Sequence, residues 1–112
     1  MEKQILGPIE VISIKKKKIL AKVDTGAEKS SIHLDLAKKI GLTKEIWGIK
    51  KIKSSNGEEY RPLVKSKIKI GNRKLPVIFT ITKRSELKYP ILIGKDILKR
   101  KFLVDVSIWN TN

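Results

Sequence analysis

The stretch Ile19-Leu20-Ala21-Lys22-Val23-Asp24-Thr25-Gly26-Ala27 joins an apolar run directly to a short acidic turn, and it is the most informative part of the chain. Alternation along a strand would place Lys22 and Asp24 on one face, opposite the apolar residues between them. Gly26 lets the backbone turn sharply after the carboxylate, and the Thr25 hydroxyl can stabilise that turn. The triplet alone is also typical of a structural turn, so the rest of the chain must supply its context.

Much of that context consists of predicted strands. Apolar residues alternate with lysines from Val64 to Ile70, which is the period of a half-buried strand. Gly71-Asn72 and Asn56-Gly57 are turn signals between such runs, and Lys15 to Lys18 forms a charged tip between two apolar segments. Turn signals at such short intervals predict a small, mostly β barrel or sandwich.

Two segments predict short helices. Ser31 to Ile40 carries apolar residues at helical spacing, and Gly41 stands where a C-terminal cap belongs. A second, shorter helix is expected from Lys95 to Lys101, after Gly94.

Composition limits the class of protein. A chain of 112 residues with 40% apolar residues predicts a single folded domain covering residues 1–112. The absence of cysteine excludes disulfides and thiolate metal sites. No apolar run approaches the roughly 20 residues of a membrane span, and no signal-peptide core is visible, so we expect a soluble cytoplasmic protein without a membrane partner.

The charge is strongly positive, with 26 Lys and Arg against 11 Asp and Glu, a net charge of +15. Such a field favours anionic partners, namely nucleic acid, an acidic membrane surface or an acidic peptide. A lysine-rich surface that serves solubility alone is the other interpretation.

Three features follow one another as they do in retroviral-type aspartic peptidases. They are the Asp24 loop, a flap-like hairpin at Asn56-Gly57, and the apolar run Ile91-Leu92-Ile93 that ends at Gly94 before a helix. From about Lys22 to Asp105 the chain also resembles a bacterial and archaeal family described as ATP-dependent zinc proteases, whose domain is retropepsin-like. The residues that carry this resemblance are Ala21 to Ala27, Ser30, Ser31 and His33; Lys53 to Gly57, Glu59 and Arg61-Pro62; and Ile91 to Asp96 with Phe102 to Asp105.

The resemblance implies a small retropepsin-like closed β-barrel with one or two short helices, working as a homodimer. Members of the family are often linked to ATP-grasp ligases that append glutamates to proteins. This link implies a role in trimming glutamate-rich peptides or protein tails, with such a ligase as a functional partner.

The dimer follows from the chemistry of the predicted site. An aspartic peptidase needs two carboxylates across one water, and this chain has one such aspartate, so the second must be Asp24 of another copy. The pair shares a proton, so one carboxylate acts as general base on the water and the other as general acid. The predicted catalytic residues are Asp24, Thr25 and Gly26.

Several residues are expected to bind substrate. By resemblance, Glu28 lies where the family binds substrate backbone, and Lys95 replaces the arginine that braces this acid, which excludes a bidentate pair. Lys22 would suit a substrate carboxylate, although it could equally extend past the cleft edge to water. Lys53 and Arg61 either grip a carboxylate or are ordinary exposed hairpin charges. The predicted substrate-binding residues are Lys22, Ala27, Glu28, Lys53, Asn56, Gly57 and Arg61.

The zinc and ATP of the family description find little support in these residues. His33 is the only histidine, and it is expected to cap a helix or pack rather than to bind metal. No phosphate-binding loop motif is present. We therefore expect neither a metal nor a cofactor. Trp47 and Trp109 are expected to be core or dimer contacts.

Three functions compete at this point. The first is a homodimeric aspartic peptidase acting on acidic peptides. The second is a non-catalytic acidic-peptide-binding module in which Lys22 has repurposed the cleft. The third, a nucleic-acid binder, rests on the charge alone and is disfavoured, because the lysines are spread along the chain and no aromatic-rich strand motif accompanies them.

Overall fold

The computed structural model describes residues 2–54, 57–83 and 88–108. Strands make up most of this part of the chain. In order, the elements are β1 (Gln4–Leu6), β2 (Ile9–Ile14), β3 (Lys17–Val23), β4 (Ser31–His33), α1 (Leu34–Lys39), the short 3-10 helix η1 (Leu42–Lys44), β5 (Gly48–Ser54), β6 (Gly57–Ile70), β7 (Arg73–Thr82), β8 (Ile91–Ile93), α2 (Lys95–Leu98) and β9 (Phe102–Val104).

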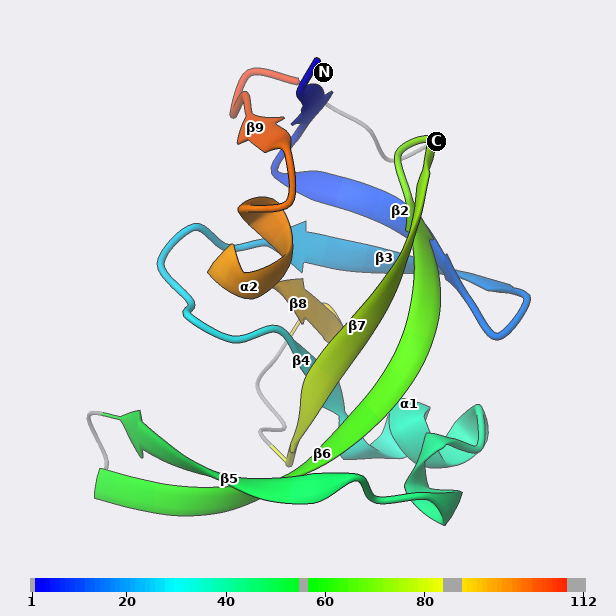
Figure 1. Cartoon of the computed structure of the whole chain (residues 1–112), viewed down its shortest axis with the longest axis vertical. Helices are drawn as coiled ribbons and strands as arrows, with labels where there is room; N and C mark the ends of the chain where they lie inside the picture. The colour runs from blue at the N-terminus through cyan, green and yellow to red at the C-terminus, as the bar shows by residue number, and fades with distance from the viewer. Residues whose placement is uncertain (1, 55–56, 84–87, 109–112) are drawn as a thin grey trace.

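The main sheet closes on itself. Its strands hydrogen-bond in the order β2-β3-β8-β4-β7-β6-β5, and β2 also pairs with β6. This second pairing joins six strands into a barrel and leaves β5 outside it, where β5 and the first part of β6 form a projecting hairpin (Figure 1). The expected closed, mostly β barrel is confirmed.

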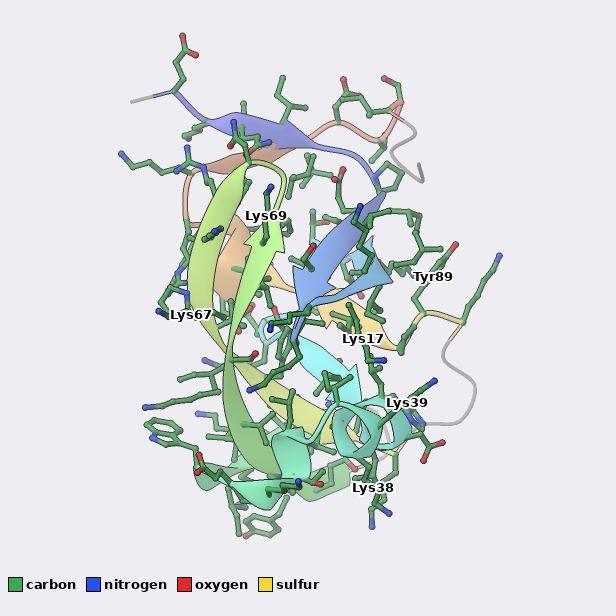
Figure 2. All side chains as sticks on the ribbon, turned by 90° about the vertical axis from the view of Figure 1, so that its right-hand side faces the viewer. Lys17, Lys38, Lys39, Lys67, Lys69 and Tyr89 are labelled. Atoms are coloured by element: carbon green, nitrogen blue, oxygen red, sulfur yellow. The ribbon has the colours of Figure 1, made fainter. Side chains whose placement is uncertain are left out.

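Strand alternation fills the barrel as the sequence predicts. Val64, Ile68 and Ile70 of β6 are buried, whereas the lysines of the alternate positions are exposed. Figure 2 labels two of these lysines, Lys67 and Lys69, on the outside of the ribbon. Each large aliphatic side chain buried in this way contributes about 1.5–3 kcal/mol.

Two tight turns connect the hairpins. Lys15 and Lys16 have φ of 49° and 66°, the left-handed pair that a two-residue hairpin needs, so the turn is shorter than the predicted tip over residues 15–18. Gly71 has φ of 60° in the predicted Gly71-Asn72 turn between β6 and β7. A third turn was predicted at Asn56-Gly57, and its Asn56 lies outside the described residues.

The first helix begins later than its sequence pattern predicts. Ser31–His33 is strand β4, which lies between β7 and β8 and fills the barrel wall. Helix α1 therefore starts at Leu34, and it ends before Gly41, whose φ of 82° fits the predicted cap. Helix α2 ends at Leu98 rather than Lys101.

The two ends of the described chain pair with each other. Gln4–Leu6 is a strand that pairs in parallel with Phe102–Val104. The segment after β9 is a turn in which the Ser107 backbone N–H and hydroxyl donate to Asp105 at 2.9 and 2.6 Å. These bonds, the hydroxyl's first, lower the pKa of the Asp105 carboxyl and divert the chain from strand geometry.

Two further predictions concern the tryptophans and membrane-spanning segments. Trp47 is 55% exposed, which excludes the core and leaves a dimer contact as the prediction, while Trp109 lies outside the described residues. Within residues 2–54, 57–83 and 88–108, no helix has the length and apolar character that a membrane span requires.

Candidate active site

The Asp24 loop begins where β3 leaves the sheet. Strand β3 runs parallel to β8, and the Asp24 N–H donates to the carbonyl of Ile93 at 2.8 Å, one residue beyond the last pair of the ladder. The Gly26 N–H then donates to Asp24 Oδ1 at 3.0 Å, and the Ala27 N–H donates to the Asp24 carbonyl at 3.2 Å. The carboxylate is thus oriented by the turn that follows it.

Gly26 has a steric reason to be glycine. A Cβ at this position would lie 3.3 Å from Asp24 Oδ1, which is tighter than most Cβ contacts. Thr25 and Gly26 are exposed and Asp24 is partly exposed, so the turn is presented at the surface of the single chain.

The second half of the loop rests on the start of α2. The N–H groups of Lys95 and Asp96 donate to the carbonyls of Ala27 and Glu28 at 2.8 and 3.3 Å. At Gly94, a Cβ would lie only 2.8 Å from the carbonyl oxygens of Ala27 and Lys29. Only glycine allows this approach, so the apolar strand ending in glycine lies behind the loop, as the sequence predicts.

A buried hydroxyl joins the same two segments. Ser30, which is fully buried, donates from Oγ to Asp96 Oδ1 at 2.6 Å and accepts from the Gly94 N–H at 2.8 Å. The Ser30 N–H donates to the other Asp96 oxygen at 3.1 Å. The sequence alone predicts no role for Ser30 or Asp96 beyond their part in the family resemblance. The structure shows that they fix the loop to α2.

Glu28 and Lys95 form the expected pair. Lys95 Nζ lies 3.1 Å from Glu28 Oε1, a single contact rather than a bidentate one. Both side chains are largely exposed, so the pair contributes only about 0–1 kcal/mol to the stability of the fold. Its main effect is to position the Glu28 carboxylate.

The predicted substrate-binding residues fall into two groups. Lys22 is exposed on the strand that leads into the loop, and Ala27 and Glu28 belong to the loop itself. Lys53, Gly57 and Arg61 lie on the β5–β6 hairpin, which projects on the same side of the barrel as the loop between β3 and β4 (Figure 1). The structure does not bring the two groups into contact through any bond between described residues.

Arg61 is already engaged within the hairpin. Its Nε donates to Glu59 Oε1 at 2.7 Å, and its side chain is only 14% exposed. On the same hairpin Lys51 pairs with Glu58 at 2.6 Å. A substrate carboxylate would have to compete with Glu59 for Arg61, whereas Lys53 is exposed.

His33 caps α1, as expected. Its Nδ1 accepts from the Asp35 N–H at 3.1 Å. Over the ranges that the structure describes, no three His, Asp or Glu side chains gather as a metal site requires. The described residues therefore do not fit the zinc of the family description.

A closed six-stranded barrel with a surface Asp-Thr-Gly turn and a projecting hairpin defines a retropepsin-like domain. The chain matches the RimB-like family, described as retropepsin-like aspartic endopeptidase RimB, over residues 33–111, and it belongs to this family. The matched segment contains the hairpin, the long strands and the Gly94–α2 junction, and it begins after the Asp24 turn.

Solved structures share the fold. The Legionella pneumophila protein Lpg0085, of unknown function, has a TM-score of 0.68 and 23% identity, covering 96% of this chain and 97% of that one. EIAV protease in complex with the inhibitor HBY-793 has a TM-score of 0.65 and 18% identity, covering 82% of this chain and 85% of that one.

Two curated relatives are longer than this chain. Those of Shewanella pealeana and Shewanella halifaxensis, both named "Probable alpha-L-glutamate ligase", are each 34% identical over 113 residues, covering 80% of this chain. The match covers 25% of each relative, so the chain spans about a quarter of their length.

Proposed function

We propose that this protein is an aspartic peptidase that hydrolyses peptide bonds in glutamate-rich peptides or protein tails. The observation that carries the proposal is the Asp24 turn. A carboxylate is held at the surface by the Gly26 N–H, and the loop behind it is fixed by the Ser30–Asp96 bond and by the close approach of Gly94. A site that must position a reacting water needs this kind of rigid support.

The proposed reaction needs two copies of the chain. One Asp24 accepts a proton from the water as it attacks the scissile carbonyl, while the partner's Asp24 donates a proton to the carbonyl oxygen. The exposed Thr25 and Gly26 leave the turn accessible to a second copy. Dimerisation therefore completes the site.

An exposed apolar surface on the paired terminal strands supports this dimer. Ile5 of β1 and Leu103 of β9 are register partners that are 51% and 49% exposed, and Val106 nearby is 80% exposed. The chain leaving β1 reaches the catalytic strand directly, because the Val23 N–H donates to the Pro8 carbonyl at 2.8 Å. We call Ile5, Leu103 and Val106 the terminal patch, and we propose that it packs against its copy.

The proposed substrate class rests on charge and on the relatives. The net charge of +15 favours acidic chains, and Lys22 and Lys53 are exposed near the turn and on the hairpin. The similarity to part of proteins named as glutamate ligases supports a link between an enzyme that adds glutamate and one that removes it. Such a ligase is the proposed functional partner.

The test is mass spectrometry of a glutamate-tailed peptide incubated with the protein. We expect the tail to shorten with the native chain, and to stay intact with Asp24→Asn, which keeps the size and the Gly26 contact of the side chain but cannot act as a base. A parallel reaction with a chelator tests the metal. Shortening of the tail by the Asp24→Asn variant would contradict the proposed mechanism. So would the loss of shortening by the native chain when the chelator is added.

One observation favours the second candidate, a non-catalytic module that binds acidic peptides. Lys22 is exposed two residues before Asp24 and, by alternation, on the same face. A lysine at this position can hold a peptide carboxylate without any turnover. Retained binding of the peptide together with no cleavage by the native chain would establish this function instead.

A further inference from the structure

A groove of about 780 Å³ lies beside the candidate catalytic loop, on the outer face of β6 and β7. By alternation, its floor consists of cross-strand neighbours on the face of β6 and β7 opposite to Val64, Val77 and Phe79, which are buried in the barrel. Figure 1 shows α2 on one side of this part of the sheet and β5 on the other. The neighbours are Leu63 with Thr80, Lys65 with Ile78, and Lys67 with Pro76.

The groove is strongly basic. Among the described residues that line it there is one carboxylate, Asp96, which accepts bonds from Ser30 and from the Ile97 N–H. None of the lining cations takes part in the ion pairs that join described residues. These neutral donors leave the charge of Asp96 in place, but the lining cations outnumber this one carboxylate, and a net positive field attracts an anion. The six cationic side chains that line the groove are Lys29, Lys50, Lys65, Lys67, Lys99 and Arg100.

The groove is continuous with the candidate site through the chain itself. Lys29 follows Glu28 in the loop that carries Asp24, and it lines the end of the groove nearest to that loop. Trp47 and Lys50 line the end at the base of the β5–β6 hairpin. A peptide that lies at the Asp24 turn and extends along this loop past Glu28 therefore meets the groove at Lys29.

The dimensions suit an extended chain. From Leu63 to Lys67 the floor runs four residue steps, or about 13 Å at roughly 3.3 Å per residue. Lys65 and Lys67 are two residues apart, so their spacing of about 7 Å equals that of alternate side chains on an extended peptide. Ile78 and Pro76 beside them offer apolar surface to the methylene groups of glutamate side chains.

We propose that this groove binds the distal acidic residues of a peptide whose nearer part lies at the Asp24 turn. The proposal takes its substrate class from the proposed function, and it adds a second binding site for the same chain. A nucleic acid fits less well, because the groove offers one aromatic ring, that of Trp47, and Lys65 Nζ lies over this ring at 4.0 Å. Stacking of successive bases needs open aromatic faces.

The experiment measures binding, by fluorescence anisotropy, of labelled glutamate peptides of about four and about twelve residues, since only the longer one can span loop and groove. The full chain carries Asp24→Asn, which prevents turnover. The groove variant adds Lys50→Gln, Lys67→Gln and Lys99→Gln. The control adds Lys17→Gln, Lys38→Gln and Lys39→Gln, an equal loss of exposed charge on β3 and α1; Figure 2 shows Lys38 and Lys39 at the opposite edge of the ribbon from Lys67.

We expect the groove variant to reduce the preference for the long peptide about tenfold, and the control to change it less than about twofold. Circular dichroism checks that both variants are folded. Equal losses in the two variants would indicate the general field of the protein and would overturn the proposal. Stronger groove-dependent binding of a single-stranded RNA of equal charge would also overturn it, in favour of a nucleic-acid surface.

Cleavage assays on chains that retain Asp24 separate this proposal from the proposed function. If the long peptide binds in a groove-dependent way and is never cleaved, the peptidase proposal fails and the groove stands. If cleavage depends on Asp24 while peptide length and the groove lysines have no effect on binding, the groove proposal alone fails.

Discussion

At the scale of single residues, Gly94 decides whether the catalytic loop can rest on α2. We expect Gly94→Ala to lower the free energy of unfolding by about 1–3 kcal/mol, because its Cβ would meet two backbone oxygens that cannot move aside. The displaced loop should also lose peptidase activity. Urea unfolding with an activity assay on the native-like fraction measures both effects.

The matched control is Gly48→Ala in β5. A Cβ there meets only the side chain of Leu63 at 3.7 Å, an ordinary contact. This change should leave stability unchanged or raise it by about 0.4–1 kcal/mol, since alanine restricts the unfolded chain. Equal destabilisation by the two substitutions would show that the close approach at Gly94 has no special cost.

At the scale of elements, α1 depends on a histidine cap. We expect His33→Ala to lower the free energy of unfolding by about 1 kcal/mol, because the Asp35 N–H loses its acceptor. His33→Asn keeps an acceptor at the cap and should recover most of this loss. Urea denaturation of the two variants measures the difference, and equal stability of the Ala and Asn variants would exclude a capping role.

The elements also show how far the sequence alone could go. The long strands, their turns and the Gly94 junction were predictable, because each follows from local alternation or from a residue with special backbone freedom. Strand β4 was not, because Ser31–His33 is held by pairing with β7 and β8, distant segments that override a helical pattern. Likewise, the role of Ser30 depends on Gly94 and Asp96, 64 and 66 residues away.

The features of the site also differ in how well the sequence predicts them. The turn at Asp24, the Glu28–Lys95 contact and the cap at His33 were predicted from neighbouring residues or from the resemblance, and the described contacts agree with them. The engagement of Arg61 by Glu59 was not predicted, because charged side chains two positions apart on a strand can adopt several arrangements. The catalytic and substrate-binding roles themselves stay predictions.

At the scale of the whole molecule, the proposed dimer should depend on the terminal patch. We expect Ile5→Lys to raise the dimer dissociation constant at least about tenfold, or about 1.4 kcal/mol, because each copy would place a charged side chain in the apolar contact. Cleavage should fall in parallel. Sedimentation at several concentrations measures the first effect, and a peptide assay at the same concentrations measures the second.

Leu20→Lys is the control, since Leu20 is 39% exposed on β3 and lies outside the terminal patch. It should leave both association and cleavage unchanged. A native chain that remains monomeric at high concentration and still cleaves would refute the shared site.

The hairpin that projects from the barrel has a consequence for colloidal behaviour. Among the described residues, strand β5 is bonded to β6 on one side only. Its other edge presents backbone N–H and C=O groups that can pair with a strand of another chain. Ile49 is 69% exposed on this edge strand, and Lys50 and Lys53 are exposed on the same strand, whereas Lys51 is paired with Glu58. The charges of Lys50 and Lys53 repel those of a second copy and so disfavour pairing between two such edges. Acetylation of both lysines, which removes their charge, should therefore favour edge-to-edge aggregation.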